Sequence, residues 1–180
     1  MRTPSLCLLA LPLLLVLAGC GGGGGSGTTS ESGAKTFNAP DVAFTFEIPE
    51  GLTQSNQDMD KVLARVSPDP SDVNSAIKIR QASAQELPHS AYLDQFRRQF
   101  QQQVGPVAKA MERHSDIQMG VLSFDQPVTL RGERTRVNSK SYFFTGGGKT
   151  WQLECVSTSK HKAKVDAACR QAIDSIKFEK

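Results

Sequence analysis

Residues 151–155 read Trp151-Gln152-Leu153-Glu154-Cys155, and in a β-strand the side chains of Trp151, Leu153 and Cys155 would share one face. A second apolar pattern follows at the three- and four-residue steps of a helix: Val165, Ala168, Cys169, Ala172, Ile173 and Ile176. Each apolar stripe carries one cysteine. We therefore predict a strand over 150–158 that packs its apolar face against a closing helix over 161–176.

Further strands are predicted upstream of this pair. The 42–48 segment has one apolar face, made of Val42, Phe44, Phe46 and Ile48, and Pro49-Glu50-Gly51 ends it. Short strands over 61–67 and 75–81 flank the turn at 68–71, and we expect these three segments to form an antiparallel meander. Additional strands are predicted over 117–123, 128–130 and 134–144.

The segment Gly147-Gly148-Lys149-Thr150 raises the question of a phosphate-binding loop. That loop needs a glycine at the position held here by Phe144, and a helix after the lysine. A strand is predicted to follow instead, so we interpret Gly146-Gly147-Gly148 as the turn of the last hairpin.

The hydrophobic period changes from strand to helix at Ser90, which is a suitable N-cap, and Gly105-Pro106 is a suitable stop. The apolar positions between and just after them are Leu93, Phe96, Phe100, Val104 and Val107. An aromatic stripe of this kind is typical of core packing. The alternative is that the stripe lines a ligand groove.

Composition and charge describe an ordinary globular chain of 180 residues with 38% hydrophobic and 22% charged content. The net charge is +3, and removing Arg2 leaves 20 basic against 18 acidic side chains. Nucleic acid is therefore not expected as a partner, because phosphate binding needs a concentrated basic face. We interpret the small basic cluster as a solvated helix face, with a phosphate or anionic-lipid site as the alternative: Lys160, His161, Lys162 and Lys164.

Residues 1–19 have the layout of an export signal, with one charge at Arg2, an apolar run over 6–17 and then small residues. About a dozen apolar residues are too few for a permanent membrane span. Leu17-Ala18-Gly19-Cys20 resembles the lipobox of bacterial lipoproteins. That resemblance implies that Cys20 carries a lipid and becomes the first residue. The alternative is an ordinary secretory signal.

Residues 20–36 consist mainly of glycine, serine and threonine and offer no apolar surface to bury. We expect a flexible tether that spans about 20 Å on average. The chain is thus divided into a lipoprotein signal peptide over 1–19, a lipidated tether over 20–36 and a globular domain over 37–180.

Cys155 and Cys169 are the cysteines left in the globular domain once Cys7 leaves with the leader and Cys20 is lipidated. In an exported, oxidising setting we expect them to form a disulfide, which would stabilise the domain by about 3 kcal/mol. Two unpaired buried thiols or a redox-active pair are the alternatives. The absence of a Cys-x-x-Cys arrangement argues against the redox-active pair.

No motif for catalysis, metal binding or a cofactor is found. His89 adjoins a proline in an expected loop, His114 lies in an expected polar connection and His161 lies among lysines, none at metal-binding spacing. Three carboxylates could meet other groups in space, but without geometry we interpret them as exposed charges: Glu112, Asp116 and Asp125. We therefore predict no catalytic residue, no metal and no cofactor, and a protein that is not an enzyme.

The order of four motifs is similar to that of the PsbP-like family, which includes actinobacterial lipoproteins of the LpqN type. The motifs are Phe44-x-Phe46-x-Ile48-Pro49-x-Gly51-Leu52, Ser90-Ala91-Tyr92-Leu93, Pro127-Val128-Thr129-Leu130-x-Gly132, and Trp151-Gln152-Leu153-Glu154-Cys155 with Ser175-Ile176-Lys177-Phe178. The resemblance covers about 37–178. It implies an α+β fold, an α/β/α sandwich around a central antiparallel β-sheet, and a non-enzymatic role in binding or assembly.

We predict a cell-envelope lipoprotein on the extracytoplasmic side of the membrane, anchored through Cys20 and acting as a binding or interaction module. Its partners are expected to be the membrane and either an unknown envelope protein or a small apolar ligand. The alternatives are a carrier of a small apolar ligand or lipid, held between the sheet and the 93–107 segment, and an uncharacterised hydrolase. A closed core under that helix would argue against this carrier site.

Overall fold

The computed structural model describes residues 35–39, 41–55, 62–72, 74–87, 89–130 and 132–178. The predicted leader and Cys20 lie outside the described residues, and the first strand begins at Lys35, two residues before the expected start of the domain. The elements in chain order are β1 (Lys35–Phe37), β2 (Phe44–Ile48), β3 (Thr53–Ser55), β4 (Ala64–Ser67), β5 (Ala76–Ser83), α1 (His89–Val104), β6 (Ala108–His114), β7 (Ile117–Leu130), β8 (Glu133–Gly146), β9 (Lys149–Thr158), α2 (Lys162–Asp174) and β10 (Lys177–Phe178).

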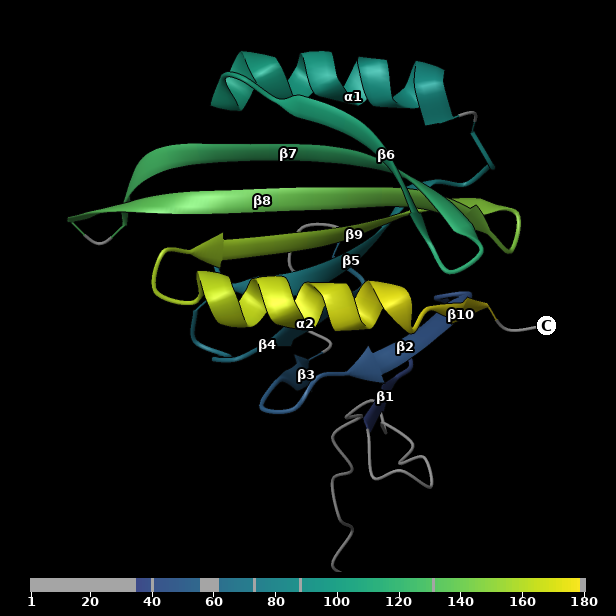
Figure 1. Ribbon diagram of the computed structural model, residues 1–180, viewed down its shortest axis with the longest axis horizontal. Helices are drawn as coiled ribbons and strands as arrows, with labels where there is room; N and C mark the ends of the chain where they lie inside the picture. The colour runs from purple at the N-terminus through teal and green to yellow at the C-terminus, as the bar shows by residue number, and fades with distance from the viewer. Residues whose placement is uncertain are drawn as a thin grey trace, which may run out of the picture.

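Seven strands form one antiparallel sheet in the order β3-β4-β5-β9-β8-β7-β6, and β2 lies between β1 and β10 in a smaller sheet (Figure 1). The two helices cover opposite faces of the large sheet. Leu122 and Phe143 belong to the core beneath α1, whereas their neighbours Val121 and Tyr142 belong to the core beneath α2. The predicted fold class, an α/β/α sandwich around a central antiparallel sheet, is confirmed.

The core beneath α2 begins with the apolar face of β9. Trp151 and Leu153 are fully buried, and the helix buries Val165, Ala168, Cys169, Ala172 and Ile173 on the same side. The Trp151 indole N–H donates a hydrogen bond to the Gly146 carbonyl oxygen at 2.9 Å, so its polar atom is satisfied inside the core. The Phe44 ring of β2 lies edge-on to the Trp151 ring, with centroids 5.5 Å apart. The predicted strand and closing helix are both present and packed together.

The core beneath α1 is closed. Leu93 is 1% exposed and Phe143 is 0% exposed. The Tyr92 ring lies edge-on to the Phe143 ring and the Phe96 ring is tilted against it, each with centroids 5.5 Å apart. A Cβ atom on Gly120 would lie 2.3 Å from Leu93 Cδ1, so α1 sits directly on the β7 backbone. The interpretation of the aromatic stripe as core is confirmed. The interface between α1 and the sheet is therefore not the carrier site that we considered above.

The meander prediction is wrong for β2. Strands β4 and β5 are antiparallel neighbours as expected, but β2 pairs with β1 and β10. Alternation of apolar residues determines which face of a strand is buried, but it does not determine which strands pair with it. The Phe44 and Phe46 rings of β2 are buried in the core beneath α2, and the strand thus extends that core beyond the large sheet.

Strand β7 is continuous where two separate strands over 117–123 and 128–130 were predicted. The turn-like residues between them include Pro127, which pairs with Arg136 of β8. Within the described chain, β6 pairs with β7 only as far as Ser123, so Pro127 lies on a part of β7 with β8 as its one neighbour. A proline is tolerated there because its missing N–H would face away from the ladder.

The turn after β8 is the glycine turn that the sequence predicts. Gly147 and Gly148 connect β8 to β9 with φ of 61° and 75°, a backbone conformation that favours glycine, so the hairpin interpretation is confirmed.

Neither helix in the described part of the chain is long and apolar enough to cross a membrane.

Candidate binding groove

A groove of about 780 Å³ lies between α2 and the strands β6, β7 and β8. It exists because β7 and β8 are 14 residues long, whereas α2 packs over β9, β5 and β2. The face of β7 and β8 beyond the helix is therefore left open. The lining residues are Pro106, Val107, Ala108, Ser123, Phe124, Asp125, Asn138, Ser139, Lys140, Tyr142, Cys155, Lys162, Asp166, Cys169 and Arg170.

The helix wall of the groove is a row of charged residues at four-residue spacing. Lys162, Asp166 and Arg170 line the groove, and Asp174 continues the row to the end of α2. The Lys162 ammonium donates to the Asp166 carboxylate. The Asp174 carboxylate is hydrogen-bonded to the His114 ring. Arg170 has no ion-pair partner among the described residues.

The strand wall carries charges that are satisfied within the protein. Lys140 Nζ lies 2.9 Å from Glu112 Oε1 and 4.9 Å from the centroid of the Tyr142 ring. Asp125 Oδ1 accepts a hydrogen bond from Arg136 Nε at 2.9 Å. The charges of the strand wall are therefore balanced by other residues of the protein, and a ligand in the groove is not needed to balance them.

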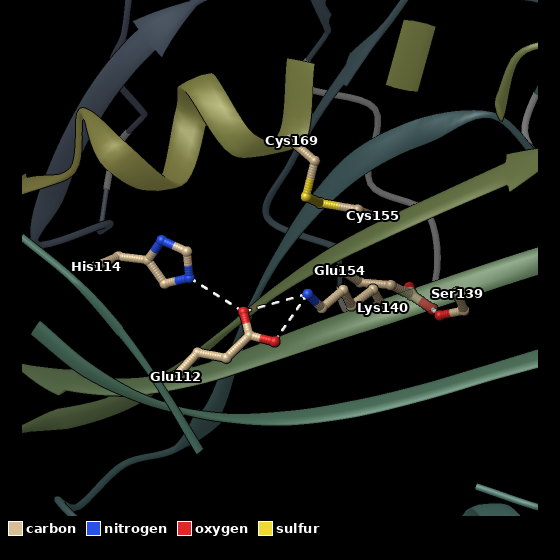
Figure 2. Close-up of a disulfide and its surroundings, with 7 residues drawn as sticks. All are labelled: Glu112, His114, Ser139, Lys140, Glu154, Cys155 and Cys169. Carbon is tan, nitrogen blue, oxygen red and sulfur yellow. Dashed lines mark hydrogen bonds and ion pairs between the residues drawn. A yellow bond between two sulfur atoms is a disulfide. The ribbon is translucent and has the colours of Figure 1, made fainter. Parts of the chain in front are cut away.

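The disulfide between Cys155 of β9 and Cys169 of α2 forms part of the lining (Figure 2). Their Cα atoms are 6.1 Å apart, and the residues are 5% and 3% exposed. The bond that the sequence predicts is thus present in the structure. Because it joins the helix to the sheet beside the groove, it fixes the distance between the two walls.

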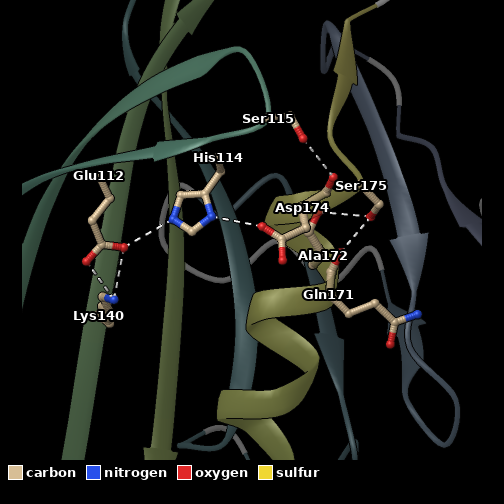
Figure 3. Close-up of polar contacts among 8 residues, drawn as sticks. All are labelled: Glu112, His114, Ser115, Lys140, Gln171, Ala172, Asp174 and Ser175. Carbon is tan, nitrogen blue, oxygen red and sulfur yellow. Dashed lines mark hydrogen bonds and ion pairs between the residues drawn. The ribbon is translucent and has the colours of Figure 1, made fainter.

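The end of α2 is tied to the β6–β7 hairpin through His114 (Figure 3). Its Nδ1 lies 2.9 Å from Asp174 Oδ1, and its Nε2 lies 3.1 Å from Glu112 Oε2. The Ser115 hydroxyl also donates to the Asp174 carbonyl oxygen at 3.3 Å. A continuous chain of contacts therefore runs from Asp174 to Lys140 and holds the helix end against the strands.

The electrostatics of this chain follow from burial and pairing. Burial raises the pKa of Glu112, but hydrogen bonds from Lys140 and His114 outweigh it, and the pKa of Glu112 is lowered. Burial lowers the pKa of Lys140, while contacts with Tyr142 and Glu112 raise it by more. Burial raises the pKa of the Tyr142 hydroxyl. Glu112 and Lys140 are therefore held as an ion pair at neutral pH.

The histidines noted in the sequence occupy three separate places. The backbone of His89 begins α1, His114 ends β6, and His161 precedes α2, with its Nε2 3.9 Å from Asp72 Oδ2. Among the residues that the structure describes, no group of three or more His, Cys, Asp or Glu side chains is arranged to hold a metal ion.

The three carboxylates interpreted as exposed charges also differ from one another. Asp116 and Asp125 are exposed, and Asp125 lines the groove. Glu112 is half-buried and bonded to both Lys140 and His114, so its interpretation as an exposed charge is wrong.

Sequence reasoning missed the polar groove residues Asn138, Lys140 and Arg170. Arg170 could have been found, because it belongs to a regular series of alternating charges on the predicted helix: Lys162, Asp166, Arg170 and Asp174. The sequence contains no comparable pattern that would identify Lys140. Its contact with Glu112 reaches across β7 and depends on the register of three strands.

Solved structures identify the fold of this chain. No family model and no curated protein matches the sequence. Solved structures do match, and they define the class: this chain has the PsbP-like α/β/α sandwich. Within that class it resembles LpqN as well as cyanobacterial PsbP, so the fold is of the PsbP-like, LpqN type.

Three solved structures illustrate the likeness. LpqN of Mycobacterium tuberculosis, described as involved in cell envelope biogenesis, has a TM-score of 0.52 and 11% identity over 76% of this chain and 83% of its own. PsbP of Synechocystis has a TM-score of 0.54 and 11% identity over 89% of this chain and 99% of its own. A Bacteroides thetaiotaomicron protein has a TM-score of 0.54 and 13% identity over 82% of this chain, which spans about half (49%) of that protein.

Proposed function

We propose that this chain is a non-enzymatic binding module of the cell envelope, anchored by a lipid on Cys20, and that the groove beside α2 is its binding site. The groove carries the proposal, because its volume of about 780 Å³ falls in the range of small-molecule sites, roughly 300–1,000 Å³. The lipobox-like Leu17-Ala18-Gly19-Cys20 supports the anchor. The fold shared with LpqN, a protein described as involved in envelope biogenesis, supports the setting.

The construction of the groove also supports binding. The disulfide fixes the helix wall to β9, and the contacts of His114 fix the end of the helix to β6. A site whose walls are already in place loses less conformational entropy when it binds a ligand. The lining also combines apolar groups with a few polar ones, as small-molecule sites do.

A variant that fills the groove tests the proposal. Ser123 lies in the lining on β7, and Thr129 lies on the same face of the same strand outside it, so Ser123→Trp and Thr129→Trp are matched. Each protein would be purified from the membranes of its own host and examined by native mass spectrometry. We expect an additional bound mass on the wild type and on Thr129→Trp, and its loss from Ser123→Trp. No bound mass on the wild type, or equal masses on all three proteins, would contradict the proposal.

A carrier of a small apolar ligand is a second candidate, now placed in this groove. It is favoured by the apolar lining of Pro106, Val107, Tyr142 and the disulfide. A carrier passes its ligand to an acceptor, whereas a binding module retains it. Transfer of the co-purified ligand from the protein to ligand-free vesicles, measured over time, separates the two candidates.

A further inference from the structure

The charges that line the groove do not all have partners. Lys162 is paired with Asp166, Lys140 with Glu112, and Asp125 with Arg136. Arg170 is the lining charge that the described residues leave unpaired. Asp166 and Asp174 lie four residues away on either side of Arg170, but Asp166 binds Lys162 and Asp174 binds His114.

The groove also presents apolar groups within the same space as Arg170. Both cysteines of the disulfide, Cys155 and Cys169, line the same groove as Arg170. The Tyr142 ring and the segment 106–108 contribute further apolar lining. A ligand that satisfies the whole site therefore needs an apolar body and one group that pairs with a guanidinium.

We infer that the groove binds an amphiphilic carboxylate, with its carboxylate on Arg170 and its apolar body against the disulfide, Tyr142 and the 106–108 segment. This inference rests on the proposed function of the groove. A guanidinium presents two parallel N–H donors that match the two oxygens of a carboxylate. A carboxylate also carries the single negative charge that one free arginine can balance, whereas a phosphate monoester carries roughly −1.5 to −2.

Decanoate and decan-1-ol test the inference, because they differ in the charged group and share the apolar chain. Binding would be measured by titration calorimetry on the full lipidated protein in phospholipid nanodiscs, with empty nanodiscs subtracted. Decanoate is expected to bind about tenfold more tightly than decan-1-ol, as a charge-assisted hydrogen-bonded pair predicts. Arg170→Gln is expected to remove this preference, and Arg170→Lys to retain part of it.

Arg98→Gln is the matched control, because Arg98 is an exposed arginine on α1, on the opposite face of the sheet. It is expected to leave the affinity for decanoate unchanged. If decanoate and decan-1-ol bind equally, or if Arg170→Gln changes nothing, the inference is overturned, while binding of both probes would still support a binding groove. If neither probe binds, the inference is also overturned, and the proposed function is then decided by the groove-filling variant.

Discussion

Gly120 and Leu93 show how single residues set the distance between α1 and the sheet. Leu93 of α1 occupies the space that a side chain on Gly120 of β7 would need, with its Cδ1 2.3 Å from the ideal Cβ position. Glycine is required at this point because a helix side chain approaches the strand backbone, and the strand conformation itself does not demand it. The closed core beneath α1 therefore depends on one very small residue facing one large residue.

Gly120→Ala is expected to destabilise the protein by about 1–3 kcal/mol, because the added methyl group forces Leu93 out of its packed position. Leu93→Ala alone is expected to cost about 2–5 kcal/mol through the cavity that it opens. The double variant should cost clearly less than the sum, since alanine at 93 leaves room for the methyl group at 120. Urea denaturation of the three variants measures this, and strictly additive effects would refute the contact.

Arg65 is a buried arginine whose guanidinium is held by hydrogen bonds to a loop. It is 2% exposed on β4, and its guanidinium donates to the carbonyl oxygens of Pro70 at 3.0 Å and Asp72 at 2.6 Å. These bonds hold the loop between β4 and β5. Arg65→Met keeps the length of the side chain and removes the donors.

We expect Arg65→Met to destabilise the protein by about 1–3 kcal/mol, because the hydrogen bonds from the buried, charged guanidinium to the loop carbonyl oxygens are lost. The loop should become cleavable by a protease at low concentration, while the far end of the sheet stays protected. Limited proteolysis with mass mapping measures this. Unchanged cleavage and stability would show that the loop is held by other contacts.

At the scale of elements, α2 is attached to the sheet at two points. The Cys155–Cys169 bond holds its middle to β9, and the Asp174–His114 contact holds its end to β6. Along its length the helix contributes an apolar face to the core and a charged row to the groove. The width of the groove therefore depends on both attachments.

Removing the disulfide by Cys155→Ala together with Cys169→Ala should lower the free energy of unfolding by about 3 kcal/mol, as expected for a loop of this length. Thermal unfolding of the two proteins measures the loss. A non-reducing peptide map of the wild type should contain one fragment that joins the two cysteines. Two free thiols in that map would contradict the predicted bond.

Glu112 makes the stability of the β6–α2 connection depend on pH. Its pKa is lowered in the folded state, so its contribution is present above the unfolded value of 4.5 and is lost as the pH falls through the lower folded value. Glu112→Gln should therefore flatten the fall in stability below pH 4.5. Glu133→Gln, at the exposed start of β8, is the control. Denaturation at a series of pH values would refute the role if both variants kept the wild-type profile.

The elements that the sequence predicted well are those with one strong period. The 150–158 strand and the closing helix were predicted because each has an apolar face and few interruptions. Strand β6 was missed because it is an edge strand, with exposed residues on both faces and no apolar stripe. Strand β7 was divided because Pro127 resembles a turn residue, and an edge position that tolerates proline is visible only in the ladder.

The groove could not be predicted from the sequence, for a related reason. It results from the different lengths of β7, β8 and α2 and from where the helix lies on the sheet. No local sequence pattern predicts where α2 lies relative to the ends of β7 and β8. The ligand groove beneath α1, which we considered as an alternative, used the strongest aromatic pattern in the sequence, and such a pattern fills a core more readily than it lines a cavity.

At the scale of the whole molecule, the proposal places a folded body with a lateral groove on a flexible, lipidated tether. Cys20→Ser tests the anchor, because a serine offers no thiol for the lipid. We expect this variant to remain an uncleaved precursor that a clickable fatty acid does not label, while the wild type is labelled and enters the detergent phase. Labelling of the variant, or no labelling of the wild type, would contradict the anchor.

An experimental structure of the protein, purified from its own membranes in a mild detergent, would show directly whether the groove is a binding site. We expect a non-protein molecule in the groove between α2 and strands β6–β8, with a polar group in contact with Arg170. An empty groove together with a bound molecule elsewhere on the protein would contradict it.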